Sequence, residues 1–370
     1  MATHFFHSGM VGAPTNTNAA GSTLAIIRAV LSTGFNLLTP QSATVASGVM
    51  TLTYSAPHGY EDKVLLRLDG APGGSVVRRV TASAGSSSLT IPAPGFADGA
   101  VSGSLSTRVA PAGWDEVFTG AGVGVFRSTV TGPGSTRFYY RVADTVSGDN
   151  PSMLRGFESM TDVDTGVGAF PTASQLSGNG VAVMRSSSGV LPWAAVADGR
   201  TLYLSLGYVV GGSGMYGYVQ HMGDATAFSS GDMFCAYVGY GDNQCDVSGG
   251  LYAARLASGA GSAVSASNYW LFPNGSGGLA DYGGRSYPSI IDGGMVFLRG
   301  VPINNSGAQV SSDVLRGTLR GLLHCSANPI AGNAVHCVFS SVSGVSGRVV
   351  VVRTRGNAGC VALPIDEDWT

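Results

Sequence analysis

Residues 153–175 read MLRGFESMTDVDTGVGAFPTASQ and connect two segments that have the composition of β-strands. The first, RFYYRVADT at residues 137–145, is rich in aromatic and β-branched side chains, and the second is VAVMR at residues 181–185. Such side chains favour strands, whereas the Gly, Asp and Thr residues of the connecting stretch favour turns. This part of the sequence therefore predicts a β protein in which short strands alternate with turns.

The same alternation continues to the end of the chain. Further predicted strands cover residues 202–209, 215–221, 233–238, 269–272, 295–298, 321–325, 335–339 and 348–353. Gly-rich turn signals such as GGSG at 211–214 and GDN at 241–243 lie between them. No segment repeats with a period of roughly 20–50 residues, which disfavours a solenoid or a propeller. We therefore expect a mainly β fold of antiparallel β-sandwich or barrel domains.

One short helix is predicted near the N-terminus, over residues 22–32 (STLAIIRAVLS). Apolar residues follow Leu24 at the spacings i+3 and i+7, so they line one face of the helix. We expect the hydroxyl of Ser22 to cap the first turn and Gly34 to end the helix in a left-handed conformation. A helix this short needs a sheet or another chain to cover its apolar face.

A small β domain is predicted between residues 40 and 111, where β-runs alternate with Gly and Pro turns. It is expected to be an insertion, because GFN at 34–36 reads as continuing at GWDEVFTG, residues 113–120. The predicted organisation has three parts. These are an N-terminal segment with the helix (1–39), the inserted domain (40–111), and a main β-sandwich region (112–370) whose point of division, if it has one, is near 250–268.

Charged residues are scarce in this chain. They make up 11% of the sequence, against roughly 25% in an ordinary globular protein. Hydrophobic residues reach 44%, so the chain does not have the composition of a disordered protein. Lys63 is the only lysine and the net charge is −2, and without clustered cations we expect no direct binding of nucleic acid. Sparse charge instead indicates a surface that neighbouring subunits cover.

No targeting or membrane segment is predicted. The start, MATHFFHSGMVG, lacks the basic and apolar regions of a signal peptide. No apolar run approaches the roughly 20 residues that a membrane-spanning helix needs. We therefore expect synthesis in a cytoplasm and no membrane span.

Three stretches resemble bacteriophage proteins. RVADT at 141–145, followed by RGFESMTDVDTGVGAFPT at 155–172, resembles a segment of a family recorded mostly as hypothetical or virion structural proteins. SGMVGAPTNTNAAGSTLAIIRAVLSTGFN at 8–36 is similar to the opening of the same family, and with gaps the likeness runs from Ser8 to about Asp232. APHGYEDKVLLRLDGA at 56–71 resembles small β modules of phage tail and fibre proteins. The resemblance implies a protein of the virion and carries no catalytic motif.

A calcium site in the sequence TDVDTG was considered and rejected. An EF-hand loop that began at Asp162 would need an oxygen ligand at its fifth position, Gly at its sixth and Glu at its twelfth. The chain has Gly166, Val167 and Ala173 there. A tight turn, in which the Asp162 carboxylate accepts backbone N–H bonds, is the better interpretation.

Zinc was considered at two His-Cys doublets, His324-Cys325 and His336-Cys337. Adjacent strand residues face opposite sides, so one doublet cannot supply both ligands to one ion. The sequence between them predicts a hairpin with SANPIAGNA as its loop and Cys325 beside Cys337, reduced or bridged. The chain has five cysteines, an odd number without CxxC, which favours free thiols. We predict no metal and no cofactor.

Three sets of carboxylates could serve a glycan hydrolase, which needs two across a cleft. They are Asp115–Glu116, Glu158–Asp162 and Asp366–Glu367–Asp368, and solvated acidic turns explain them equally well. No GxSxG motif is present, and GAGVG at 120–124 lacks the strand–turn–helix context of a phosphate-binding loop. We predict no catalytic residues.

Aromatic side chains form the candidate contact surface. They are Tyr208, Tyr216, Tyr218, Tyr237, Tyr240 and Trp369. Tyrosines among glycines suit contact with protein or sugar. Two alternatives stay open, a sheet face of cross-strand aromatic pairs for the tyrosines and a Trp369 that folds back on its own domain.

We expect a non-enzymatic structural component of a phage particle, of the tail or baseplate, assembled in the host cytoplasm with copies of itself and other virion proteins. A terminal segment is expected to pack on another chain. The alternatives are a receptor-binding tail protein that contacts a host surface glycan or protein, a head decoration protein, and a tail-associated glycan hydrolase.

Overall fold

A computed structural model describes residues 2–147, 152–171, 181–183, 189–209, 215–239, 251–256, 297–299, 302–304, 315–325, 330, 334–342, 344–353 and 360–369. Strands make up 48% of the structure and helix 5%, and several antiparallel sheets are present. The expected mainly β, antiparallel class with one short helix is confirmed. No closed barrel is found among the described strands.

The main body contains three large sheets. The first holds β1 (His4–His7), β18 (Trp193–Ala197), β19 (Thr201–Val209), β20 (Met215–Ala227), β21 (Phe234–Gly239) and β22 (Leu251–Leu256), with β25 (Leu315–Leu319) and β24 (Pro302–Asn304) continuing from β20. The second holds β11 (Trp114–Gly120), β12 (Val123–Ser128), β13 (Tyr139–Ala143), β14 (Ser152–Phe157) and β17 (Val181–Val183). The third runs in the order β23 (Phe297–Arg299), β26 (Leu323–Cys325), β29 (Cys360–Pro364), β28 (Val349–Arg353) and β27 (His336–Phe339).

The first sheet is the middle layer, because core residues cover both of its faces. Strand β18 reads WAAVA and is buried at every position. Trp193 and Ala195 belong to the core shared with the second sheet, whereas Val196 belongs to the core shared with the third. A strand buried on both faces is apolar throughout instead of alternating, which explains why its sequence shows no polar position.

Residues 153–171 fold back on the second sheet. Strand β14, which the sequence analysis did not predict, occupies the first part of this stretch, and β15 (Ser159–Met160) pairs with β16 (Gly166–Val167) in the middle. Gly156 and Phe170 then exchange two backbone hydrogen bonds of 2.9 Å. A Cβ on Gly156 would lie 2.2 Å from the Phe170 ring, so only glycine fits beneath that ring.

The predicted helix begins at Ser22, as α1 (Ser22–Arg28), and continues as a π-helical turn, Ala29–Thr33. Its cap is not the one expected, because the Ser22 hydroxyl donates to the Thr15 carbonyl oxygen at 2.8 Å instead. The buried Asp144 carboxylate accepts the N–H groups of Thr23 and Leu24 at 2.8 and 3.2 Å. Gly34 ends the helix with a positive φ of 67°, but its ψ of −171° lies outside the left-handed helical region, so the expected left-handed cap is not formed.

The apolar face of the helix is covered by a sheet of its own chain, which is one of the two alternatives that the sequence left open. Leu24 and Ile27 are 3% and 0% exposed. A Cβ on Gly124 of β12 would lie 2.8 Å from Leu24, so this glycine admits the helix onto the second sheet.

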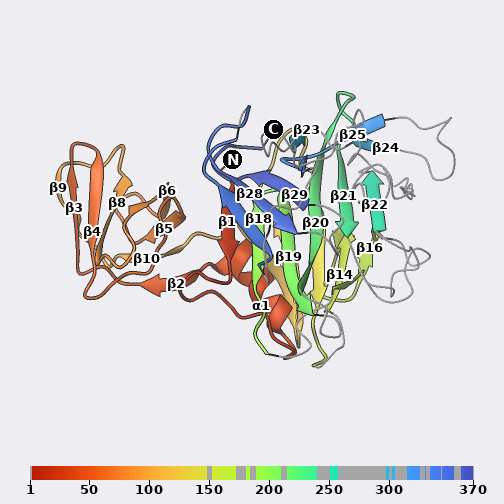
Figure 1. Ribbon diagram of the computed structural model, residues 1–370, viewed down its shortest axis with the longest axis horizontal. Coiled ribbons are helices and arrows are strands. Elements are labelled where there is room, and N and C mark those ends of the chain that lie inside the picture. The colour runs from red at the N-terminus through yellow and green to blue at the C-terminus, as the bar shows by residue number, and fades with distance from the viewer. Residues whose placement is uncertain are drawn as a thin grey trace, which may run out of the picture.

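Figure 1 shows a second lobe that projects from the main body and contains β2 to β10. One of its sheets holds β2 (Phe35–Leu38), β10 (Ser106–Val109), β5 (Leu65–Asp69) and β6 (Val76–Arg79). The other holds β7 (Thr81–Ala82), β8 (Ser88–Pro92), β4 (Val49–Thr53), β3 (Ser42–Ala46) and β9 (Gly99–Ala100). We call this lobe the inserted domain; it begins with β2 at Phe35, five residues before the predicted boundary at residue 40.

The chain leaves and re-enters the main body at neighbouring points. The N–H of Ala112 donates to the Val30 carbonyl oxygen at 2.8 Å, and the N–H of Gly113 donates to that of Leu31 at 3.1 Å. This geometry suits an insertion. That the inserted domain folds independently stays a prediction. The N-terminal segment is not separate from the body, because β1 pairs with β18 over all four of its residues.

The predicted hairpin between the two His-Cys doublets is wrong. Strands β26 and β27 lie in one sheet, but β29 and β28 lie between them. The register partner of Cys325 is therefore Cys360, and that of Cys337 is Val351. Strands β28 and β29, which come later in the chain, lie between β26 and β27. The local sequence around the doublets does not indicate this arrangement. The strand predicted at residues 269–272 lies outside the described residues.

Candidate functional site

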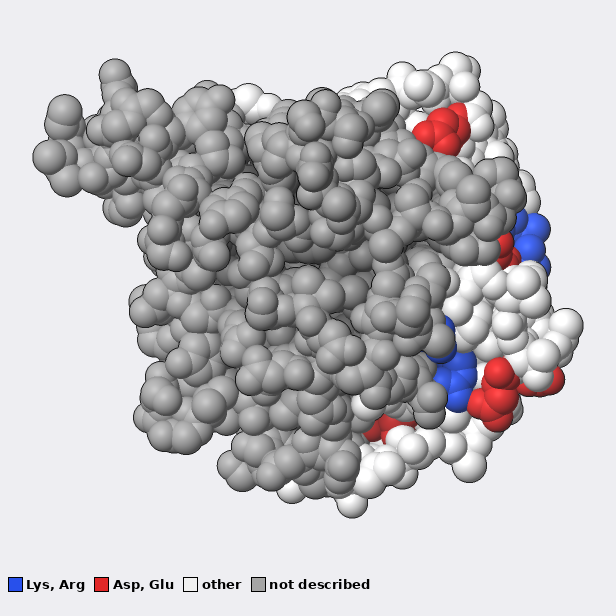
Figure 2. Space-filling model, turned by 90° about the vertical axis from the view of Figure 1, so that its right-hand side faces the viewer, with Lys and Arg blue, Asp and Glu red and all other residues white. Residues whose placement is uncertain are grey.

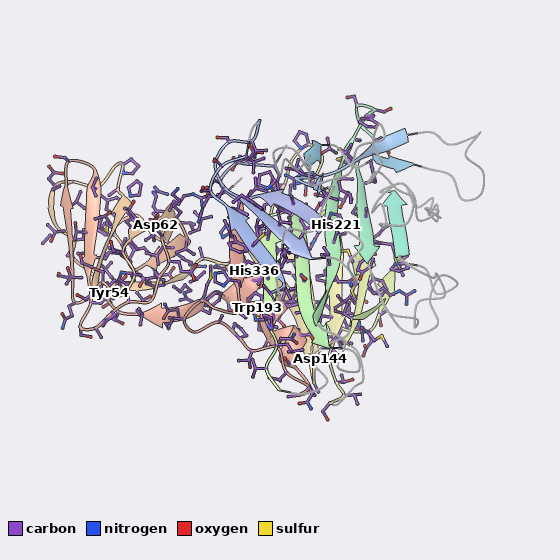
Figure 3. The ribbon with its side chains drawn as sticks, viewed as in Figure 1. Tyr54, Asp62, Asp144, Trp193, His221 and His336 are labelled. Atoms are coloured by element: carbon purple, nitrogen blue, oxygen red, sulfur yellow. The ribbon has the colours of Figure 1, made fainter. Side chains whose placement is uncertain are left out.

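The inserted domain and the main body enclose a cleft of about 170 Å³. In Figure 3, Asp62 lies on the inserted domain and His336 on the main body. Three parts of the chain supply the lining: the N-terminal strand, the loop before β5 with the end of β6, and the third sheet. The lining residues are Thr3, Phe5, His7, Met10, Glu61, Asp62, Lys63, Val64, Leu65, Arg79, His336, Val338, Arg348 and Ile365.

His7 links the two lobes through Glu61. Its Nε2 lies 3.0 Å from Glu61 Oε2, and the backbone N–H of Gly9 donates to its Nδ1 at 3.2 Å. Since Nδ1 accepts a hydrogen bond, Nε2 carries the hydrogen that is donated to Glu61. This hydrogen bond holds the pKa of Glu61 below its usual value. Both ring nitrogens of His7 are therefore engaged, which suits a positioning contact better than a free base.

His336 lies against this pair and has an unused nitrogen. Its ring centroid is 5.0 Å from that of His7 and 5.5 Å from that of Phe5. Burial, reinforced by the neighbouring His7, lowers the pKa of His336 to about 4, so the ring is neutral at neutral pH. Its Nδ1 is buried and has no hydrogen-bond partner among the described residues.

An arginine pair closes the far side of the cleft. Arg348 donates from Nε and Nη2 to the two carboxylate oxygens of Asp366, at 3.0 and 2.9 Å. Arg79 of the inserted domain donates from Nη1 to Asp366 Oδ1 at 3.3 Å and to the Lys63 carbonyl oxygen at 2.9 Å. Although burial acts to raise the pKa of Asp366, the hydrogen bonds from Arg348 keep it below the ordinary value. The contact with Asp366 thus ties the two lobes together a second time.

Trp369 is buried, which corrects its place on the expected contact surface and supports the alternative that it folds back. It is 5% exposed, and its indole packs edge-on against Tyr203 at 5.4 Å. Its carbonyl oxygen accepts a 2.7 Å hydrogen bond from Arg320 Nη2. Arg320 also forms a 2.9 Å ion pair with Asp198, whose side chain is 0% exposed. The C-terminal segment is therefore locked to the middle layer of its own chain.

The tyrosines are only partly described. Tyr237 is fully buried and its hydroxyl donates to Gln220 Oε1, so it does not belong to an exposed surface. The backbones of Tyr208 and Tyr216 are cross-strand partners in β19 and β20. The side chains of these two and of Tyr218, and the whole of Tyr240, lie outside the described residues.

The other sequence candidates have structural roles. Asp162 Oδ1 accepts the N–H groups of Asp164 and Thr165 at 2.8 and 2.7 Å, which confirms the turn interpretation. Glu116 is held by Arg28 through two hydrogen bonds of 2.7 and 2.6 Å. Among the described residues, no group of three or more His, Cys, Asp or Glu is arranged to hold a metal ion.

The cleft residues were missed because no local pattern marks them. His7 and Glu61 are 54 positions apart, and His336 comes from the last third of the chain. The sequence singled out His336 only as a possible zinc ligand and Lys63 only as the one lysine, and the sequence context of neither indicates a shared site.

Fold and site together define a three-layer antiparallel β protein with an inserted β domain and a cleft between the two. No protein family, curated protein or solved structure matches the chain. In the described part of the chain, no helix is long and apolar enough to cross a membrane.

Proposed function

We propose that the chain is a non-enzymatic structural component of a bacteriophage particle, of its tail or baseplate, and acts by assembly with copies of itself and other virion proteins. The resemblance of residues 8–36 and 141–172 to phage virion proteins supports the class of particle. The mainly β fold with a projecting domain suits a part that presents preformed surfaces to its neighbours.

The observation that carries the proposal is that several of the few charges of this chain are paired with one another inside the fold. Glu116, Asp69, Asp198, Asp224 and Asp366 each pair with an arginine and are each less than one fifth exposed. On the described part of the face in Figure 2, at its right-hand edge, the Lys/Arg and Asp/Glu side chains form small separate groups. A surface with so little free charge is best kept soluble by burial against other subunits.

The same pairing supports a role without catalysis. Each carboxylate set considered for a glycan hydrolase has a member in a structural bond: Glu116 with Arg28, Asp162 in its turn, and Asp366 with Arg348. A general acid or base needs a carboxyl group that is free to exchange a proton with substrate.

Assembly is tested by multi-angle light scattering of the purified protein at micromolar concentration, over a range of salt. We expect a multi-subunit mass that persists in high salt, because contacts with few ion pairs are not screened. Each contact should bury on the order of 800 Å² per partner. A monomer under all conditions would contradict assembly by this chain alone.

Location is tested separately by mass spectrometry of density-purified phage particles. The chain should be present in a fixed ratio to the major tail protein. Recovery only in the unassembled lysate fraction would rule out a virion protein.

A further inference from the structure

The cleft between the lobes contains hydrogen-bond donors that the protein itself does not use. The Lys63 ammonium has no ion pair or hydrogen bond with any described side chain. Only Nη1 of Arg79 has protein partners among the described residues, which leaves its Nε and Nη2 unpaired. His336 Nδ1 is buried and unpaired as well. These groups come from both lobes and line one cavity.

The acidic groups of the cleft are, in contrast, mostly engaged. Glu61 is bonded to His7, and Asp366 is bonded to Arg348 and Arg79. Asp62 accepts the N–H of Ala82 at 3.2 Å through one oxygen. The cleft groups without a described partner are therefore the Lys63 ammonium, two nitrogens of Arg79 and one of His336, besides one carboxylate oxygen each of Glu61 and Asp62, and two of these groups are cationic.

The walls and the size of the cleft favour a small occupant. Phe5, Val64, Val338 and Ile365 supply apolar surface, which strengthens charge interactions by excluding water. A cavity of about 170 Å³ holds a few water molecules or one small organic group. Clefts at domain junctions with a few convergent polar groups are the usual setting of ligand sites.

We propose that this cleft binds a small oxyanion, a phosphate or the carboxylate of an acidic sugar, between Lys63 and Arg79 of the inserted domain and His336 of the main body. The side chain of Lys63 would supply the unpaired charge and Arg79 a planar pair of donors. His336 Nδ1 would donate a hydrogen bond to the anion. A ligand held in this way would bridge the two lobes, in addition to the His7–Glu61 and Arg79–Asp366 contacts.

The test is isothermal titration calorimetry of the full chain with three probes: inorganic phosphate, D-glucuronate and the neutral sugar D-glucose. We expect saturable binding of phosphate or glucuronate and none of glucose. Preference for phosphate would assign the site to free or esterified phosphate, and preference for glucuronate to a carboxylated sugar. Equal binding of glucose, or no binding of either anion, would overturn the proposal.

Variants place the binding in the cleft. Lys63→Gln should weaken the binding of the preferred anion about tenfold or more, as expected for loss of a charge-assisted hydrogen bond. His336→Gln retains a hydrogen-bond donor and should weaken it less. Arg78→Gln is the matched control, because Arg78 neighbours Arg79 on β6 but does not line the cleft. Unchanged affinity in a folded Lys63→Gln protein, or an equal loss in Arg78→Gln, would show that the anion binds elsewhere.

This test is independent of the proposed assembly. An assembled particle protein without an anion site would fail the calorimetry and pass light scattering. A monomer that binds the anion would do the reverse.

Discussion

His221 is a buried histidine that is expected to make the stability of this fold sensitive to acid. It lies in β20, is 0% exposed, and neither ring nitrogen has a partner among the described residues. Burial, with the nearby Arg320 charge, lowers the pKa of His221 to about 3. Burial also lowers the pKa of His4 to about 4. Each of these histidines takes up a proton more readily in the unfolded chain than in the folded one.

The protein should therefore lose stability as pH falls below the unfolded value of 6.5. The contribution of His221 is fully present above that pH and is lost progressively toward about 3, because the unfolded state binds the proton first. His221→Leu should reduce the loss of unfolding free energy between about pH 7.5 and about pH 5 by about 2 kcal/mol. Urea unfolding at the two pH values measures this. Val190→Ser, at an exposed position, should leave the loss unchanged, and an unchanged loss in His221→Leu would refute the assignment.

The contact between Gly156 and the Phe170 ring allows a test of close packing in which no charge is involved. The Gly156 backbone does not have positive φ, so a side chain is excluded only by the Phe170 ring, which would lie 2.2 Å from a Cβ at this position. Gly156→Ala should cost about 1–3 kcal/mol by overpacking. Gly120→Ala is the control, since the nearest side-chain atom would be at an ordinary 3.5 Å, and replacing a strand glycine there should be neutral or slightly stabilising. Similar thermal melting of the two variants would argue against the tight contact.

At the scale of elements, Asp144 replaces the local cap that the sequence predicted for α1. It lies just after β13 and accepts the N–H groups of Thr23 and Leu24 in a buried position. Asp144→Ala should therefore cost about 2 kcal/mol, because a cap is lost and two buried donors are left unpaired. Asp144→Asn keeps an acceptor oxygen and should lose less. Denaturant unfolding followed by circular dichroism measures both, and equal stability of Asp144→Ala and the parent would exclude this capping role.

The difference between local and long-range contacts explains what could be predicted from the sequence. Composition and turn chemistry identified β13, predicted over residues 137–145 and found at Tyr139–Ala143, and the start of α1, because those signals are local. Pairing is not local: nothing near Cys325 indicates that Cys360, and not Cys337, lies opposite it. Strand β18 escaped detection because it is buried on both faces and shows no alternation. The cleft could not be predicted at all, because its groups meet only when both lobes are folded.

At the scale of the whole molecule, the main question is whether the inserted domain and the body are independent units. Among the described strands, no sheet contains strands of both lobes. The chain passes from one lobe to the other beside the π-helical turn. Yet one continuous core cluster includes Phe6 and Phe35, whose rings lie 6.2 Å apart, and polar contacts join the lobes at Glu61 and Arg79. The lobes therefore have separate β-sheets but are joined by packing and by side-chain hydrogen bonds.

We predict that replacing residues 40–111 with a short Gly linker leaves the body folded. Phe35 and Val109 are register partners where the chain leaves and re-enters the body, so a linker long enough to run back along β2 from residue 39 can reach residue 112. The body keeps its three layers but loses the contacts of His7 and Asp366 with the inserted domain, so it should melt cooperatively at a lower temperature. Glu61→Gln in the full chain is the control, because it weakens one contact between the lobes and removes no strand. If circular dichroism finds the deleted protein unfolded while Glu61→Gln is native, the two lobes form one folding unit through their common core. The deletion should also abolish anion binding, since Lys63 and Arg79 are removed with it.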